Sequence, residues 1–218
     1  MNSDVIQGVY DIGAAQPESQ PNPVETDTID AASVHPKVGS ISVLPWEVID
    51  TFSGALTLTF NDVVLPGDAG LDLHVTRSYS SKDGRWRFGI GPDAIFDDPN
   101  DLRHPIVMDV GGGQQPMFLT GSPGVYLTTD LWRYTVTATD RVLETPQGLV
   151  YRYAQADATG NVRYLTSITD AFGNVVTLTY LSHSLQGMIL ERITSAGRQV
   201  TFSYYDNGRP FRVTVHSV

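Results

Sequence analysis

Histidines and carboxylates are the side chains of this chain best suited to hold a metal ion or transfer a proton. The histidines are His35, His74, His104, His183 and His216, and their spacing contains no HExxH pattern. An acidic loop, Asp97–Asp101, could supply calcium ligands, but it lacks the regular alternation and the turn glycine of a calcium loop. We therefore expect a solvated acidic loop and no bound metal or cofactor.

Nucleophilic catalysis requires a nucleophile, a base and an orienting acid in defined geometry. The chain contains no cysteine and no Gly-x-Ser-x-Gly element, since Gly121-Ser-Pro-Gly124 is one residue too short. Gly89-Ile-Gly91 and Gly111-Gly-Gly113 precede no helical pattern, so they indicate hairpin turns and not phosphate loops. No residue set has both the types and the spacing that catalysis needs, and the sequence predicts a protein that is not an enzyme.

Aromatic residues beside arginines offer a different chemistry, the stacking of a sugar or a base. Arg85-Trp-Arg-Phe88 is the most basic aromatic cluster. The alternative, which strand alternation favours, is an edge strand with the tryptophan in the core and both arginines in solvent. Trp86, Tyr126 and Trp132 are the candidate glycan contacts.

The elements that would position these side chains are strands. Val176, Leu178 and Tyr180 alternate with Thr177 and Thr179, the period of a strand with one apolar and one polar face. The same alternation occurs over residues 56–61, 71–76 and 200–204, and glycine-containing turns separate the segments. The sequence predicts an all-β fold of antiparallel hairpins that form a curved sheet.

Composition limits the partners of the chain. Its 218 residues include 14 Lys and Arg against 24 Asp and Glu, a net charge of −10. An acidic chain with no basic stripe is a poor ligand for phosphate backbones, so we expect no nucleic acid partner. No apolar run approaches the ~20 residues of a membrane span, and the first residues lack the pattern of a cleavable signal peptide.

The N-terminal segment, residues 1–44, is predicted to be an acidic, proline-rich tail that is extended or disordered alone. Residues 1–36 contain six acidic residues and no Lys or Arg. Alternatively, the tail becomes ordered along a partner surface, with Val5–Tyr10 and Ile41–Leu44 as apolar anchors. After the tail, we expect a β domain over 45–140 and hairpin repeats over 141–218.

An internal repeat occupies the C-terminal third. One copy runs from Leu165 to Tyr180 and the next from Leu190 to Tyr204, with their glycines 24 residues apart. Because one hairpin cannot bury its apolar face alone, such units must stack side by side. The structural repeat positions are turn residues Gly148, Gly173 and Gly197, with Ile168, Tyr180, Ile193, Phe202 and Tyr204 in the core between hairpins.

These repeats resemble the RHS/YD-repeat family. The YD-like element is Tyr204-Tyr-Asp-Asn-Gly-Arg209, and Asp50–Leu58 is similar to the opening strand of the domain that starts an RHS shell. Phe88-Gly-Ile-Gly91 matches a Gly-x-Gly element of that domain, although Pro92 stands where the family commonly has tryptophan. The resemblance covers about residues 45–218.

The resemblance implies a spiral of β-hairpins that closes into a hollow shell. In bacterial polymorphic toxins of this family, the shell encloses a toxic C-terminal segment of the same polypeptide. The expected partners are therefore the remainder of the same RHS polypeptide or its C-terminal toxin, and the expected location is secreted or injected. An unfinished spiral leaves an open sheet edge and an uncovered inner face, which predicts self-association as a second kind of contact.

Two function hypotheses follow. The first is a structural, encapsulating N-terminal segment of an RHS-repeat toxin or effector shell, with no catalysis of its own. The alternative is a carbohydrate- or cell-surface-binding YD-repeat module that uses exposed aromatic residues.

Overall fold

The computed structural model describes residues 8–11, 40–41, 44–50, 54–67, 71–97, 105–110 and 113–217. Every regular element in these ranges is a strand, and all the strand pairs are antiparallel. The all-β, antiparallel prediction is confirmed. Among the described residues there is no helix long and apolar enough to cross a membrane.

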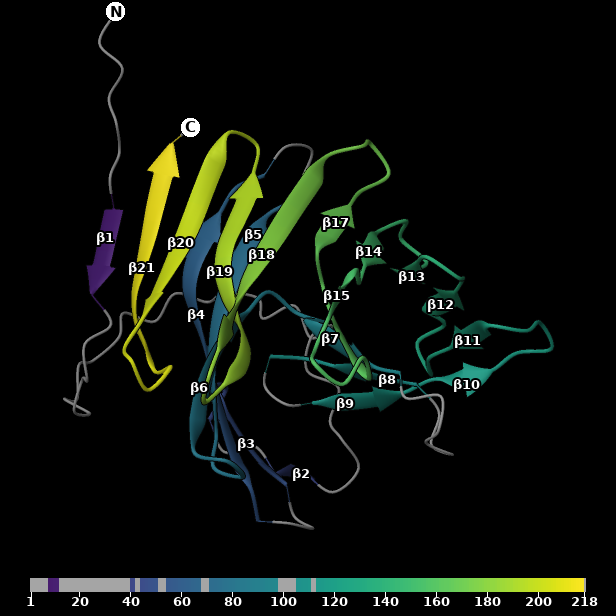
Figure 1. Ribbon diagram of the computed structural model, residues 1–218, viewed down its shortest axis with the longest axis horizontal. Coiled ribbons are helices and arrows are strands. Elements are labelled where there is room, and N and C mark those ends of the chain that lie inside the picture. Colours follow the sequence, from purple (N-terminus) through teal and green to yellow (C-terminus); the bar gives the residue numbers. More distant parts are fainter. Residues whose placement is uncertain are drawn as a thin grey trace, which may run out of the picture.

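The largest of three sheets, here called the main sheet, has eleven strands in the order β1-β21-β20-β19-β18-β17-β14-β13-β12-β11-β10. Figure 1 shows it turning from the long strands β18–β21 to the short strands β10–β14. Its strands are β1 (Gly8–Asp11), β10 (Phe118–Leu119), β11 (Val125–Leu127), β12 (Arg133–Val136), β13 (Arg141–Glu144), β14 (Val150–Arg152), β17 (Ser167–Thr169), β18 (Val175–His183), β19 (Gly187–Ser195), β20 (Arg198–Tyr204) and β21 (Pro210–Ser217).

Two five-stranded sheets complete the fold (Figure 1). The first, here sheet B, contains β2 (Ser40–Ile41), β3 (Glu47–Asp50), β4 (Leu56–Leu65), β5 (Leu73–Ser80) and β6 (Arg85–Gly89). The second, here sheet C, contains β15 (Gln155–Ala156), β16 (Val162–Tyr164), β7 (Ala94–Phe96), β8 (Ile106–Met108) and β9 (Gln114–Pro116). The hairpin β15–β16 leaves the main sheet between β14 and β17 and pairs with β7, so it joins the two sheets.

Three turns of the main sheet share one hydrogen-bond pattern, in 145–149, 170–174 and 205–209. In each, the amide of the fourth residue, a glycine, donates to the first carbonyl, and the first amide donates to the fifth carbonyl. These glycines, Gly148, Gly173 and Gly208, have φ values of +87°, +87° and +76°. A turn followed by a residue at positive φ is a common three-residue hairpin loop, and glycine adopts that conformation without steric cost.

The Gly197 turn is built differently. Ser195 pairs directly with Arg198, which leaves a two-residue loop of Ala196 and Gly197. Both have positive φ, +47° and +71°, as a type I′ turn requires. The repeat therefore uses two turn types.

The core lies where the apolar face of the main sheet meets sheets B and C. Each repeat contributes buried residues at matching positions. Leu165 and Leu190 are the first residues of their copies, and Leu178 and Phe202 lie near the ends. Phe202 packs against Phe88 of sheet B with ring centroids 4.8 Å apart. This face is thus covered within the chain, so the expectation that it would be uncovered is wrong.

Two short strands fall within the predicted tail. β1 pairs with β21 from Gly8–Val215 to Asp11–Arg212, so part of the expected open edge is occupied. β2 pairs with β3 at the edge of sheet B. The other residues of 1–43 lie outside the described ranges. The predicted boundary at 140/141 falls between β12 and β13, which are neighbours in the main sheet, and the two-domain division stays a prediction.

Candidate functional site

The predicted repeat positions lie along the packed face of the main sheet. Ile168, Ile193 and Phe202 are buried, and the rings of Tyr180 and Tyr204 pack against the same core. The Tyr204 hydroxyl donates to the Leu190 carbonyl at 2.6 Å, which ties β20 to β19. These residues join neighbouring hairpins.

The three candidate glycan-contact aromatics have different surroundings. Trp132 stacks on Tyr151 with ring centroids 6.0 Å apart and planes 7° apart. Tyr126 packs on Tyr134 at 6.0 Å. Trp86 lines an open pocket.

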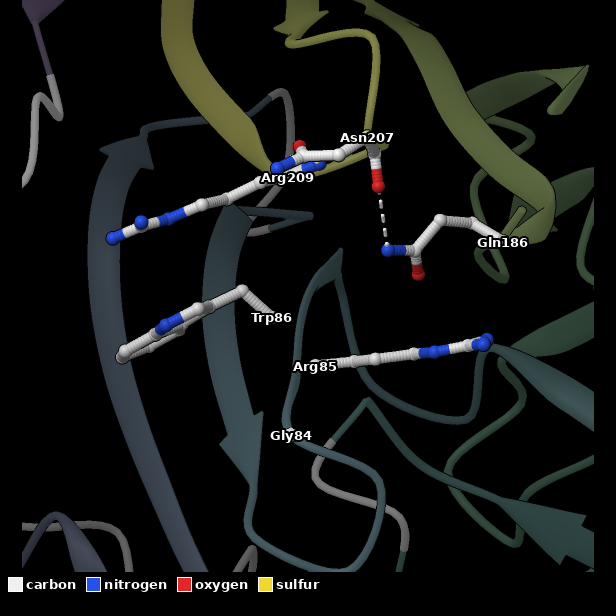
Figure 2. A pocket seen from close by; sticks show the side chains of 6 residues that line it. All are labelled: Gly84, Arg85, Trp86, Gln186, Asn207 and Arg209. Carbon is white, nitrogen blue, oxygen red and sulfur yellow. Dashed lines mark hydrogen bonds between the residues drawn. The ribbon is translucent and has the colours of Figure 1, made fainter. Parts of the chain in front are cut away.

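This pocket has a volume of about 410 Å³ and a mainly polar lining (Figure 2). It lies between the β5–β6 turn of sheet B and two turns of the main sheet, β18–β19 and β20–β21. Its lining residues are Gly84, Arg85, Trp86, Gln186, Asn207 and Arg209. The site therefore joins residues that are more than 100 positions apart in the sequence.

Two turns of the main sheet form one rigid side of the pocket. Gln186 Nε2 donates to the Asn207 carbonyl at 3.2 Å, and His183 Nε2 lies 3.1 Å from the Asp206 carbonyl. Gly208, at positive φ, packs so closely on Gln186 that a β-carbon there would clash with that side chain. The glycine thus permits the two turns to meet.

Trp86 forms the opposite side of the pocket, and other side chains of sheet B contact its ring. Its ring lies 5.2 Å from Tyr79 and 6.2 Å from Phe60, centroid to centroid. The guanidinium carbon of Arg77 lies 5.0 Å from the Trp86 ring centroid, a cation–π distance. Sheet B therefore fixes the indole before any ligand arrives.

Two arginines line the pocket. Asp83, in the β5–β6 turn, forms its ion pair with Arg87. Neither Arg85 nor Arg209 forms an ion pair with another described residue. Figure 2 shows Arg209 and Trp86 extending to the same side, whereas Arg85 extends to the other side, below Gln186. The lining can donate hydrogen bonds to a ligand beside an aromatic surface.

A buried polar junction lies where sheet C meets the main sheet. Asp93 Oδ1 accepts from the Ile90 amide at 2.9 Å, whereas its buried Oδ2 has no hydrogen-bond partner in the described part of the chain. Burial raises the pKa of the Asp93 carboxyl to about 8, against the lowering effect of the Ile90 amide, and Asp109 raises it further. The Tyr180 hydroxyl is also buried without a partner there, and the Tyr153 hydroxyl donates to the Pro92 carbonyl at 2.8 Å.

Asp97 is the first residue of the acidic loop that was expected to be solvated, but its carboxylate accepts hydrogen bonds from other side chains. Asp97 Oδ2 accepts from Arg141 Nε at 2.7 Å and from the Tyr134 hydroxyl at 3.1 Å. Burial and the Asp97 carboxylate raise the pKa of Tyr134, so the phenol stays protonated. Residues 98–104, including His104, lie outside the described ranges. In the residues that are described, no group of three His, Asp or Glu side chains could hold a metal ion.

Sequence reasoning found part of the pocket but not the pocket itself. It singled out Arg85 and Trp86 as a cluster, and Asn207 and Arg209 as part of a repeat. Gln186 was missed, because a glutamine in a turn has no distinguishing pattern. What the sequence did not reveal was the meeting of the three turns.

The chain has a distant similarity to a known structure. No family model matches the chain, and no curated protein matches it. Among solved structures, the chain is similar to part of the Photorhabdus luminescens Tc holotoxin pore, determined with a mutant of TccC3, at a TM-score of 0.44 and 12% sequence identity. The match covers 83% of this chain and 13% of that one.

Proposed function

We propose that this chain is a structural wall segment, the opening part of an RHS/YD-repeat shell that encloses downstream chain. The observation that carries the proposal is the main sheet, in which the hairpins from β10 to β21 pair with their neighbours in chain order. The YD-like motifs of the sequence lie in these hairpins. A sheet built by adding hairpins can be lengthened by further repeats.

In this proposal the chain performs no catalysis of its own. Its partner is the remainder of an RHS polypeptide or the C-terminal toxin of that polypeptide, and the whole is secreted or injected by a bacterium. The described residues contribute stacked hairpins and a shared core, which suit a wall.

Protease protection tests the proposal on the natural gene product. If the chain belongs to an enclosing wall, segments downstream of it should resist trypsin for far longer than the same segments produced alone. Gly173→Val should reduce that protection, because valine does not tolerate the φ of +87°. Phe172→Ser, at an exposed position of the same turn, is the matched control. Equal digestion of enclosed and isolated segments would refute encapsulation.

A second candidate function is carbohydrate or surface binding through the Trp86 pocket. The specific observation is a partly exposed indole beside amide and guanidinium groups in one pocket. Aromatic faces with a few polar groups are typical of ligand sites. A glycan titration followed by calorimetry should saturate for the wild type and weaken for Trp86→Ala; a flat titration would remove this candidate.

A further inference from the structure

We propose that β1 is an exchangeable strand, and that two copies of this chain form a dimer in which each copy places Gly8–Asp11 against β21 of the other. The inference goes beyond the proposed wall, because it concerns the contact between copies. Its starting point is one edge of the main sheet, where β1 lies beside β21 (Figure 1). There Gly8–Asp11 pairs antiparallel with Arg212–Val215.

The connection of β1 to the rest of the chain is long. Short turns join β18 to β19, β19 to β20 and β20 to β21, so these strands pair with their neighbours in chain order. By contrast, 28 residues, 12–39, separate Asp11 from Ser40, where β2 begins in sheet B. Because an extended chain rises roughly 3.3 Å per residue, a connection of this length reaches up to about 90 Å. It is long enough to let β1 pair with a neighbouring copy.

The pairing that holds β1 in place is small. Four residues of β1 pair, and among the described strands their partner is β21 alone. A terminal strand with few backbone hydrogen bonds opens locally far more often than the whole fold unfolds. Closing a long loop within one chain also costs conformational entropy, which reduces the advantage of the chain's own strand over the same strand of another copy.

The edge of β21 stays formed when β1 leaves it. β21 pairs with β20 from Arg198–Ser217 to Tyr204–Pro210, and Val213 is fully buried in the core. The uncovered edge then offers backbone donors and acceptors to one further strand. Residues 8–11 of a second copy fit this edge, because they are identical to the segment that it already holds. Reciprocal exchange fills both edges, so the assembly stops at two copies.

Thiol cross-linking can detect the exchange, because the chain contains no cysteine. Val9 and Thr214 are opposite in register, and opposite positions of an antiparallel pair lie about 4.5–5.5 Å apart between α-carbons, a distance that a disulfide can bridge. Full-length chain with Val9→Cys is mixed with full-length chain with Thr214→Cys, the two differing in an affinity tag, and the mixture is oxidised gently. We expect a disulfide-linked heterodimer whose yield rises with concentration.

The matched control mixes Thr201→Cys with Thr214→Cys. Thr201 also lies opposite Thr214, but it belongs to β20, which a short turn holds in its own chain. We expect several-fold less heterodimer from this mixture. A chain that carries both Val9→Cys and Thr214→Cys should form the bond within one copy at low concentration and between copies at high concentration.

The other outcomes would overturn the exchange. If the double variant forms its bond within one copy at every concentration and the Val9→Cys mixture gives no heterodimer, β1 is a fixed strand. Equal yields from the two mixtures would show that the thiols meet by random collision. If Val9→Cys forms no bond to Thr214→Cys in either format, β1 does not pair with β21 and has no place to exchange.

Discussion

At the scale of single residues, the turns differ in whether the residue at positive φ is a glycine. Gly173 and Ala196 both have positive φ, +87° and +47°, but only one of them is glycine. A residue with a β-carbon costs about 1–2 kcal/mol in the left-handed region. The Ala196 turn therefore stores a strain that the Gly173 turn avoids.

We expect Ala196→Gly to raise the free energy of unfolding by about 0.5–1 kcal/mol, since relief of strain exceeds the added entropy of the unfolded chain. Gly173→Ala should lower it by about 1–2 kcal/mol, although no atom lies within 4 Å of the new β-carbon. Gly121→Ala, in equally open space without positive φ, is the control. Urea denaturation measures all three, and equal effects at Gly173 and Gly121 would contradict the backbone explanation.

The buried carboxyl of Asp93 makes the free energy of unfolding depend on pH. The pKa of this carboxyl is about 8 in the folded chain, raised by burial from 3.8. The folded state therefore retains a proton that the unfolded state releases at acidic pH. Its contribution to stability is full below about pH 4, falls as pH rises, and is lost above about pH 8.

We expect Asp93→Asn to remove this fall, so the curves of unfolding free energy against pH should diverge most between pH 5 and 8. Asp109 also raises the Asp93 pKa, so Asp109→Asn should shift the fall to lower pH without removing it. Urea denaturation at fixed pH steps measures both. Parallel curves for the wild type and Asp93→Asn would show that Asp93 does not titrate in this range.

At the scale of elements, the tyrosine that ends a repeat connects one hairpin to the core. The Tyr180 ring packs against the core and lies 5.3 Å from Tyr164 of sheet C. We expect Tyr180→Ala to cost about 3 kcal/mol, because it leaves a cavity between sheets. Tyr205→Ala, at a position 49% exposed, should cost less than 1 kcal/mol. Thermal unfolding of both compares them, and a Tyr180→Ala variant as stable as the wild type would contradict stacked repeats.

The sequence was most informative about single strands and turns. Alternation over Val176–Tyr180 predicted β18, and the repeated glycines predicted the turns, because strand period and positive φ are local properties. The covering of the apolar face by sheet B was not predictable, since it depends on contacts such as Phe88–Phe202 between distant segments. The pocket was unpredictable for the same reason, because Trp86 and Arg209 meet only after both sheets form.

At the scale of the whole molecule, β1 closes one edge of the main sheet. β1 pairs with Arg212–Val215 of β21. β1 therefore covers the edge of β21 that would otherwise be free to pair with another strand.

Removal of residues 1–11 should expose this edge and promote self-association, because unpaired strand edges pair with other chains. Sedimentation velocity over a range of concentrations should show larger species for the shortened chain than for the full one. A shortened chain that stays monomeric at every concentration would contradict the protective role of β1.

The central claim, that this chain is a wall segment of a larger shell, is tested most directly by the intact mass of the natural gene product in its source cell. For a wall segment, we expect a species much larger than the 23.8 kDa of this chain, or a stable complex with a larger fragment. A folded, monomeric product of 23.8 kDa without such a complex would contradict it.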